Sequence, residues 1–334
     1  MLDPGVTHGL AAGIPGLVFA HRFREGAAER LDPGEAARAL HEPGTWLWLH
    51  LSLAEEGARD FIAQADIPER ARALLLSDDN HLRLEPIAGG VAGVFADFLR
   101  DVDGETRGIG RLRFALTDTL VISGRWSALG GISRTLKALD EGARFPHAVA
   151  LLEAIVDHFA DATASVAEEL ADQLDAIEDR VLEERTSDER RSLGPVRRTA
   201  VRLHRQLASL RVLFRRWGGP AGGELPSRLG EAAARLAQRL DSLDLEIVSL
   251  QDRAKLLQDE IAAKIATDTN RHLFALTLAT AFILPPTLVV GVFGMNVSDL
   301  PFTKGENGFT WAMLLTIGAC AAVYGLLRML RIMR

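Results

Sequence analysis

Two long apolar runs without charged residues close the sequence. Residues 273–293 form a run of 21 and residues 309–327 a run of 19, with no Asp, Glu, Lys or Arg in either. A helix needs about 20 apolar residues to cross the hydrocarbon core of a bilayer. Buried helices of soluble proteins are rarely this long and uncharged. The chain is therefore predicted to end in a hairpin of two transmembrane helices.

The remainder has the composition of a soluble protein. The 334 residues are 48% hydrophobic and carry a formal net charge of −7, a weak acidic balance that argues against nucleic acid as a partner. Residues 1–16 lack the basic start and unbroken apolar core of a signal peptide. The single cysteine, Cys320, falls in the second apolar run, which excludes a disulfide scaffold or a cysteine metal cluster.

Basic residues flank the two apolar runs at the ends away from the connecting loop. They are Lys264, Arg271 and His272 before the first run, and Arg328, Arg331 and Arg334 after the second. Basic flanks stay on the cytoplasmic side of a membrane. Both termini, including a basic tail at 328–334, are therefore predicted to be cytoplasmic, with the loop at 294–308 outside.

A long helix precedes the first span. Residues 231–284 contain neither glycine nor proline, and apolar residues recur in alternating steps of four and three, as in a heptad seam. A stalk helix over 223–272 is predicted to run directly into the span. Part of the seam is expected to pack in a helical bundle within one chain, which is the alternative interpretation of the whole seam. A rod fused to a span favours several copies side by side, because one helix cannot line a pore. The seam consists of Leu229, Ala233, Leu236, Leu240, Leu243, Ile247, Leu250, Ala254, Leu257 and Ile261.

Two helices of opposite charge are predicted before the stalk, as an antiparallel hairpin over 146–222. Residues 161–189 hold 11 Asp or Glu against two Arg, whereas residues 196–217 hold seven Arg and no acid. Gly194-Pro195 is predicted to separate them. The charges indicate pairing between neighbouring helices or, alternatively, an acidic face that collects cations near a pore entrance.

Residues 1–145 are predicted to form a mixed α/β domain. Strand-like segments cover 17–23, 46–53, 91–99, 111–116 and 120–123, and helical segments cover 61–65, 69–76 and 126–139. The sequence has no P-loop and no dinucleotide fingerprint. Its histidines lack the paired spacing of a zinc enzyme. An enzymatic function and a bound cofactor are therefore not expected.

Polar residues recur on one face of the first span. The predicted pore-lining stripe is Asn270, Leu273, Thr277, Thr280, Leu284, Thr287 and Gly291. Around a ring of copies it would give alternating polar and apolar collars, although membrane threonines also bond to their own helix carbonyls without further purpose. Neutral oxygens can hold a hydrated cation through its bound waters. Charge selectivity would then come from Asp299 and Glu306 at the outer mouth.

Gly294-Met295-Asn296 follows the first span directly. The carbonyl oxygen of the Asn296 side chain can accept hydrogen bonds from the waters of an ion, so Asn296 is the predicted first selectivity ring and the site of the hydrated metal. Gly294 permits an unusual turn, and Met295 is expected to pack against it.

The C-terminal part resembles the CorA superfamily of divalent metal-ion transporters. The resemblance rests on Pro285-Pro286-Thr287, Gly291 and Phe293-Gly294-Met295-Asn296, followed by a second span and a basic tail. It implies an α+β cytoplasmic domain, a long helical stalk and two transmembrane helices in a funnel-shaped homopentamer of the inner membrane. It also implies that the first span lines the pore and the second surrounds it.

Within that superfamily the outer loop is similar to the ZntB branch, which is associated with zinc. Asn296-Val297-Ser298-Asp299-Leu300-Pro301 and Asn307-Gly308-Phe309 carry the similarity, although Ser298-Asp299 stands where small glycines are usual. The resemblance implies zinc transport, with protons as coupling ions and with cobalt, nickel and cadmium as further cargo. His272 or the loop acids would be the proton sites, because the spans contain no carboxylate.

Two other functions stay open from the sequence. One is a magnesium and cobalt channel of the CorA type, in which Asp78 and Asp79 would lie near a regulatory cytoplasmic metal site; a solvated turn at the end of a helix explains these two residues equally well. The other is a membrane-anchored coiled-coil adaptor, which would have no use for a polar stripe in its first span.

Overall fold

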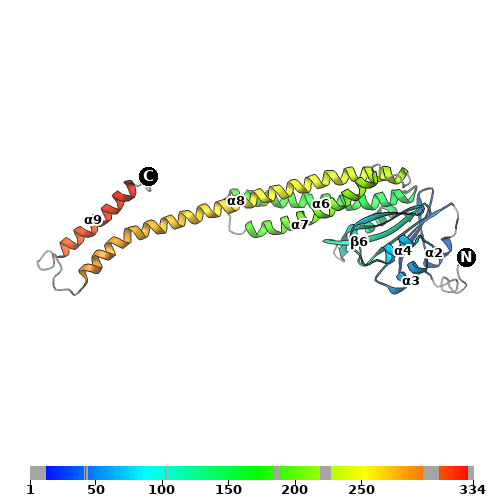
Figure 1. Ribbon diagram of the computed structural model, residues 1–334, viewed down its shortest axis with the longest axis horizontal. Helices are drawn as coiled ribbons and strands as arrows, with labels where there is room; N and C mark the ends of the chain where they lie inside the picture. Colours follow the sequence, from blue (N-terminus) through cyan, green and yellow to red (C-terminus); the bar gives the residue numbers. More distant parts are fainter. Residues whose placement is uncertain are drawn as a thin grey trace. The chain divides into compact units, whose positions relative to one another are not determined.

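The structure is a computed structural model that describes residues 13–40, 42, 44–101, 104–183, 189–218, 227–295 and 308–329. It divides into two compact units, Met1–Leu257 and Gln258–Arg334, and the division falls inside helix α8 (Figure 1). The strands are β1 (Leu17–Arg24), β2 (Ala27–Leu31), β3 (Trp46–Ser52), β4 (Arg83–Ile87), β5 (Gly90–Asp101), β6 (Gly104–Thr117) and β7 (Leu120–Arg125). The helices are α2 (Pro33–Ala39), α3 (Glu56–Gln64), α4 (Glu69–Leu76), α5 (Gly130–Asp140), α6 (Ala148–Leu182), α7 (Glu189–Gly218), α8 (Ser227–Phe293) and α9 (Gly308–Met329).

The strands form one mixed sheet in the first unit. Their order is β2-β1-β3-β7-β6-β5-β4, and the only parallel pair among the described strands is β3 with β7. All five predicted strands are present. β2 and β4 were not predicted, and both are edge strands: β2 is short and polar, and β4 contains Pro86, which an edge strand tolerates because it has no ladder bond to donate there.

A tight turn creates the edge strand β2. Arg24 pairs with Ala27, so only Glu25 and Gly26 form the loop, and both have positive φ, 48° and 83°. This geometry matches the twist of a hairpin, and a glycine in the second position makes it accessible. The turn, rather than any apolar alternation, sets the strand Ala27–Leu31.

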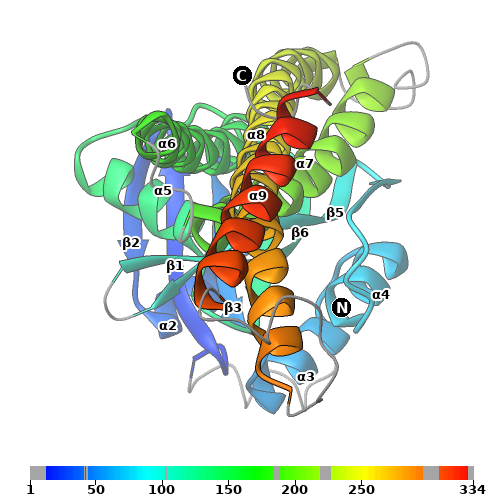
Figure 2. The ribbon, with the colours of Figure 1, turned by 90° about the vertical axis from the view of Figure 1, so that its left-hand side faces the viewer.

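One face of the sheet is covered by α2, α3 and α4 (Figure 2). Alternate side chains of β3, namely Leu47, Leu49 and Leu51, are at most 3% exposed and pack with Ile62 of α3 and Leu75 of α4. The predicted helix at 69–76 has the observed bounds, and the helix predicted at 61–65 is the second half of α3.

The other face of β3 carries Trp48 and His50, both fully buried. The Trp48 indole donates to Ser123 Oγ over 2.8 Å, and His50 Nδ1 lies 2.7 Å from the same oxygen. Phe19 stacks on the His50 ring with centroids 4.8 Å apart. One hydroxyl on β7 therefore bonds to one nitrogen of each of two buried side chains of β3 and helps to join these neighbouring strands.

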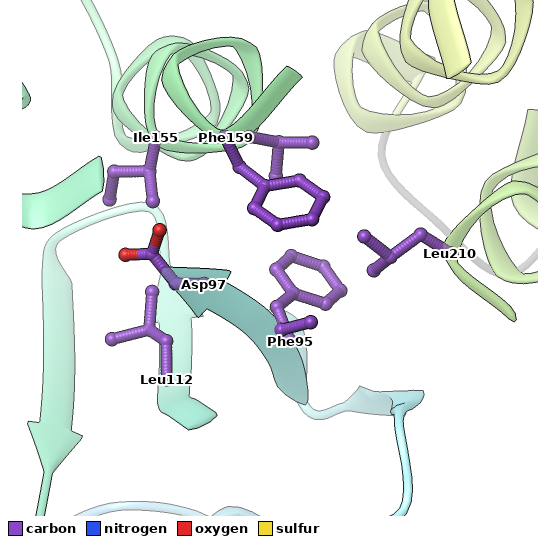
Figure 3. Close-up of a pocket in the computed structure, with 8 residues that line it drawn as sticks. Phe95, Asp97, Leu112, Ile155, Phe159 and Leu210 are labelled. Carbon is purple, nitrogen blue, oxygen red and sulfur yellow. The ribbon is translucent and has the colours of Figure 1, made fainter. Parts of the chain in front are cut away.

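Asp97 fixes the start of α5. Its buried carboxylate accepts hydrogen bonds from the backbone N–H of Gly131 over 2.9 and 3.1 Å, which satisfies a free donor at a helix N-terminus. The helix predicted at 126–139 therefore begins four residues later, at Gly130. Figure 3 shows Asp97 beside a cavity of about 10 Å³ between Phe95, Phe159 and Leu210, which join the sheet to α6 and α7.

Helices α6 and α7 pack against the first part of α8. Nine of the ten seam residues of α8 are buried, and Leu243 is half-buried. Most of the seam is therefore buried within one chain, and the number of copies stays a prediction. The intrachain bundle, which was the alternative, is the observed arrangement.

Ion pairs join α8 both to the acidic helix α6 and to the basic helix α7. Arg235, Arg239 and Arg253 of α8 reach acids of α6, with Arg235 Nε 2.7 Å from Glu153 and Arg253 Nη2 2.6 Å from Asp175. On its other side, α8 offers aspartates to the basic α7. Asp244, whose side chain is 4% exposed, lies 2.7 Å from both Arg211 Nη1 and His204 Nδ1, and Asp241 lies 2.6 Å from Arg215 Nη2.

Gly194 and Pro195 do not separate the two charged helices. Both lie inside α7, which begins at Glu189, and Arg180 near the end of α6 pairs with Glu189 over 2.7 Å. The prediction was wrong because α7 continues through Pro195, its seventh residue, although proline has no N–H to donate to the carbonyl four residues earlier. Two charged helices do follow one another here, but the break between them precedes Glu189.

Acid should destabilise the protein through His50. Burial, followed by repulsion from Arg125, lowers the pKa of His50 to about 3 from 6.5. Between these values the unfolded chain binds a proton that the folded chain does not. The free energy of unfolding is therefore unaffected above pH 6.5 and falls by up to about 1.4 kcal/mol per pH unit below it.

In the His50→Gln variant, the melting temperature should fall less than in the wild type as the pH is lowered from about 7 to about 5. His272→Gln, at an exposed histidine, is the matched control and should keep the wild-type slope. Equal slopes for the wild type and His50→Gln, measured by thermal unfolding, would contradict the assignment.

Candidate ion-conduction pathway

Two helices of the second unit, α9 and the end of α8, are long and apolar enough to cross a membrane. None of the most apolar stretch of either helix is buried. A core helix of a soluble protein would be covered by its own chain. Both predicted spans lie within these helices, and the stalk and first span form one helix of 67 residues.

The α9 helix covers one face of the end of α8. Half-buried residues of α8 recur at Leu278, Phe282, Pro285 and Val289, and the Sγ atom of Cys320 in α9 lies 3.9 Å from the Phe282 carbonyl oxygen. Pro286 has no N–H to donate to that carbonyl, which is four residues earlier. A thiol from the neighbouring helix therefore lies beside an acceptor that the diproline leaves free.

Every residue of the predicted stripe is exposed. Leu273 is 54% exposed and Leu284 67%, and Asn270, Thr277, Thr280, Thr287 and Gly291 are exposed as well. At about 100° per residue, the stripe lies on nearly the opposite side of α8 from the face that α9 covers. The residues that flank it, such as Leu276, Ile283 and Leu288, are apolar and also exposed. The polar side chains are thus gathered on one bare face.

The threonines of the stripe share one geometry. Thr277, Thr280 and Thr287 donate their hydroxyls to the carbonyl four residues earlier, over 2.8, 2.9 and 2.8 Å. Thr269 and Thr316 do the same off the stripe, so the bond itself is a general habit of helical threonine. Its consequence is specific to position: with the hydrogen used, each Oγ offers only acceptor lone pairs to whatever occupies the bare face.

The outer part of the candidate site is only partly described. Helix α8 ends at Phe293, and Gly294 N–H closes the last turn on the Val290 carbonyl over 2.8 Å. Met295 is 53% exposed. Asn296, Asp299 and Glu306 lie outside the described residues. Their predicted roles in selectivity and at the outer mouth stay predictions.

The Asp78-Asp79 pair lies in a turn that its own neighbours organise. Asp79 is bonded to the N–H and ring of His81 and to the guanidinium of Arg83, and these partners lower the pKa of the Asp79 carboxyl to about 2. Among the described residues, no three His, Cys, Asp or Glu side chains gather as a metal site. The geometry is that of a solvated turn, and the cytoplasmic metal site stays an untested prediction.

The acidic face of α6 is partly neutralised. Asp157, Asp161, Asp175 and Glu178 each pair with an arginine of α8. These acids therefore contribute more to the packing of the helical bundle than to an acidic face that collects cations.

Asp259 is a further candidate that the sequence analysis missed. It is exposed on α8, eleven residues before Asn270, and helix periodicity places it on the same face as the stripe. Continuing the stripe backward from Asn270 by one step of seven and one of four would have found it, but the sequence analysis began at the edge of the apolar run.

An α/β domain, a long helix and two apolar helices with a polar stripe define a class of membrane transport protein. Residues 43–329 match the family described as CorA-like Mg2+ transporter protein, and the chain belongs to this family. Its members are transporters, not enzymes. The resemblance inferred from the sequence is thereby confirmed.

Relatives of known name cover nearly the whole chain. The zinc transport protein ZntB of Yersinia enterocolitica is 26% identical over 322 residues, covering 93% of this chain and 95% of the relative. The divalent cation transporter CmaX of Pseudomonas aeruginosa is 27% identical over 330 residues, covering 95% and 96%. The solved structure of full-length CmaX has a TM-score of 0.80 at 25% identity, covering 95% of this chain and 98% of that one.

Cysteine accessibility should separate the two faces of α8. In a Cys320→Ser background, which removes the only native thiol, Thr277→Cys and Leu284→Cys should react with a charged, water-soluble methanethiosulfonate in proteoliposomes. Val289→Cys, on the face that α9 covers, is the matched control and should stay unmodified. Labelling of Val289→Cys in preference to Thr277→Cys would contradict this assignment of faces.

Proposed function

We propose that this protein moves divalent metal cations across a membrane through a pore that the bare face of α8 lines in a ring of copies, with Zn²⁺ as the principal cargo. The observation that carries the proposal is the row of back-bonded threonines opposite α9. A single helix cannot enclose a pore, so several copies must contribute this face. The family resemblance supports five.

The stripe suits a cation that keeps its water. Waters bound to a metal ion act as hydrogen-bond donors toward their surroundings, and Thr277, Thr280 and Thr287 present acceptors only. Imidazole and thiolate, the ligands that hold Zn²⁺ tightly, are missing from the stripe, and Cys320 is on α9. A path without strong ligands favours passage over capture.

The ends of the path supply charge. Asp259 at the inner end, and Asp299 and Glu306 in the outer loop, would be multiplied by the number of subunits and would raise the local cation concentration. Asn296 would bind the waters of the entering ion. The basic flanks at Arg271 and Arg328 support cytoplasmic termini in an inner membrane, with the α/β domain inside.

Zinc is favoured by the ZntB relatives and by the outer loop. The family description and the neutral stripe favour a second candidate, Mg²⁺, because magnesium releases its water reluctantly. A membrane-anchored adaptor is disfavoured by the polar stripe. Proton coupling would have to use His272 or the loop acids, since residues 273–293 and 309–327 contain no carboxylate.

Zinc uptake into proteoliposomes tests the proposal directly. Purified protein should accelerate uptake, reported by an internal zinc-sensitive dye, and Asn296→Ala should slow the initial rate by about tenfold or more because each subunit loses an acceptor for the ion's waters. Thr277→Val, which keeps the shape and removes the hydroxyl, should slow it several-fold. Thr316→Val, an equivalent change on α9, is the matched control and should leave the rate unchanged.

Uptake that is absent, or equal in all three variants, would contradict the pore. Repeating the assay with Mg²⁺, and with a proton gradient imposed or collapsed, assigns the cargo and the coupling. Faster magnesium than zinc transport would favour the second candidate.

A further inference from the structure

A groove of about 370 Å³ opens in the α/β domain, away from the conduction pathway. It lies between the loop that follows α4 and the connection from β7 to α5, and its lining includes Asn80, Leu99, Ile109, Arg111, Trp126 and Ser127. The volume lies within the range of small-molecule sites, about 300–1,000 Å³. Polar and apolar side chains both contribute to its wall.

Neutral partners hold the Arg111 guanidinium in place, and it has no counter-ion among the described residues. Its half-buried guanidinium donates from Nε to the Asn80 carbonyl and from Nη1 to the Gly110 carbonyl, each over 3.0 Å. Both partners are neutral, and within the part of the chain that the structure describes no carboxylate lies within ion-pair distance of Arg111. Burial lowers the pKa of the Arg111 guanidinium.

A second arginine and several acids lie near Arg111. Arg113, two residues along β6 and 1% exposed, donates from Nε to the Ser77 carbonyl and from Nη2 to Asn80 Oδ1, and its Nη1 has no partner. Of the nearby acids, Asp79 is committed to Arg83, and Asp78 acts on Arg113. Arg83 also lies 3.6 Å from Glu85, so these neighbouring charges largely balance. Among the described residues that line the groove, Arg111 is the one charged side chain, and it makes the wall cationic.

The indole ring of Trp126 lines the same groove as Arg111. Trp126 is 43% exposed, and the guanidinium of Arg59 from α3 lies 5.8 Å from its ring centroid. Leu99 and Ile109 supply an apolar wall, and Ser127 supplies a hydroxyl. An exposed indole with apolar neighbours gains free energy when a flat ring covers it.

We propose that this groove binds a small organic anion that carries a planar ring, of the nucleotide class, with its phosphate on Arg111 and its ring against Trp126. The fixed orientation of Arg111 leaves the Nη2 edge for the phosphate, a charge-assisted contact that guanidinium groups make well. Such a ligand would act on the α/β domain independently of whether the transported ion is zinc or magnesium.

Adenosine 5′-monophosphate is the probe for the test. Calorimetric titration of the purified full-length protein should show saturable binding with a Kd of about 10–1,000 µM, the range for a ligand of this size in an open groove. Arg111→Gln should weaken binding by about tenfold or more. Arg111→Lys should lose less, because it keeps the charge, and Trp126→Ala should weaken adenosine monophosphate more than ribose 5-phosphate.

Arg70→Gln is the matched control, since Arg70 is an exposed arginine of the neighbouring α4. It should bind like the wild type. All variants are compared at equal oligomeric state and melting temperature, and Trp126→Ala provides the test if Arg111→Gln fails to fold.

No binding at millimolar nucleotide, equal loss in Arg70→Gln, or inorganic phosphate binding as tightly as the nucleotide would overturn the proposal. So would a Trp126 that acrylamide cannot quench, which would show the groove covered by another copy.

Discussion

A helix of 67 residues cannot bury all of its sides within its own chain, and this constraint on α8 organises the molecule. The first part of α8 buries its apolar seam, around Leu240 and Ile247, against α6 and α7. The last part has only α9 against one face. What remains bare there is apolar on its flanks and polar along one stripe. In the proposed pore, lipid or another helix would cover the flanks and water would contact the stripe.

Charge explains how α8 keeps its place between helices of opposite sign. Arginines on one side of α8 meet the acids of α6, while Asp241 and Asp244 on the other side meet the arginines of α7. Exposed pairs such as Arg235–Glu153 contribute little each. The pair at Asp244 is different, because this carboxylate is nearly buried and would be costly to leave without partners. It fixes the register between α7 and α8.

The sequence predicts most of the helices and strands that a strong and local sequence pattern marks. The uncharged runs define α9 and the end of α8, and short, largely apolar runs define β3 and β5. The edge strand at Ala27–Leu31 depends on a two-residue turn rather than on its own side chains. The start of α5 depends on Asp97, which is 34 residues away from Gly131.

The seam was visible, but its partners were not, because periodicity shows that a face is buried and not which chain buries it. The stripe from Asn270 to Gly291 was predicted with its periodicity, and its position opposite α9 emerged only from packing. The groove at Arg111 joins residues from four separate segments, which no linear motif marks.

The central claim is that the bare face of α8 borders a shared aqueous axis. Double electron–electron resonance between spin labels at equivalent positions of neighbouring subunits measures this directly. With labels at Leu284 the shortest intersubunit distance should be smaller than with labels at Val289, because the first faces the axis and the second faces α9. A longer distance at Leu284 than at Val289, or no dipolar coupling at either position, would contradict the account.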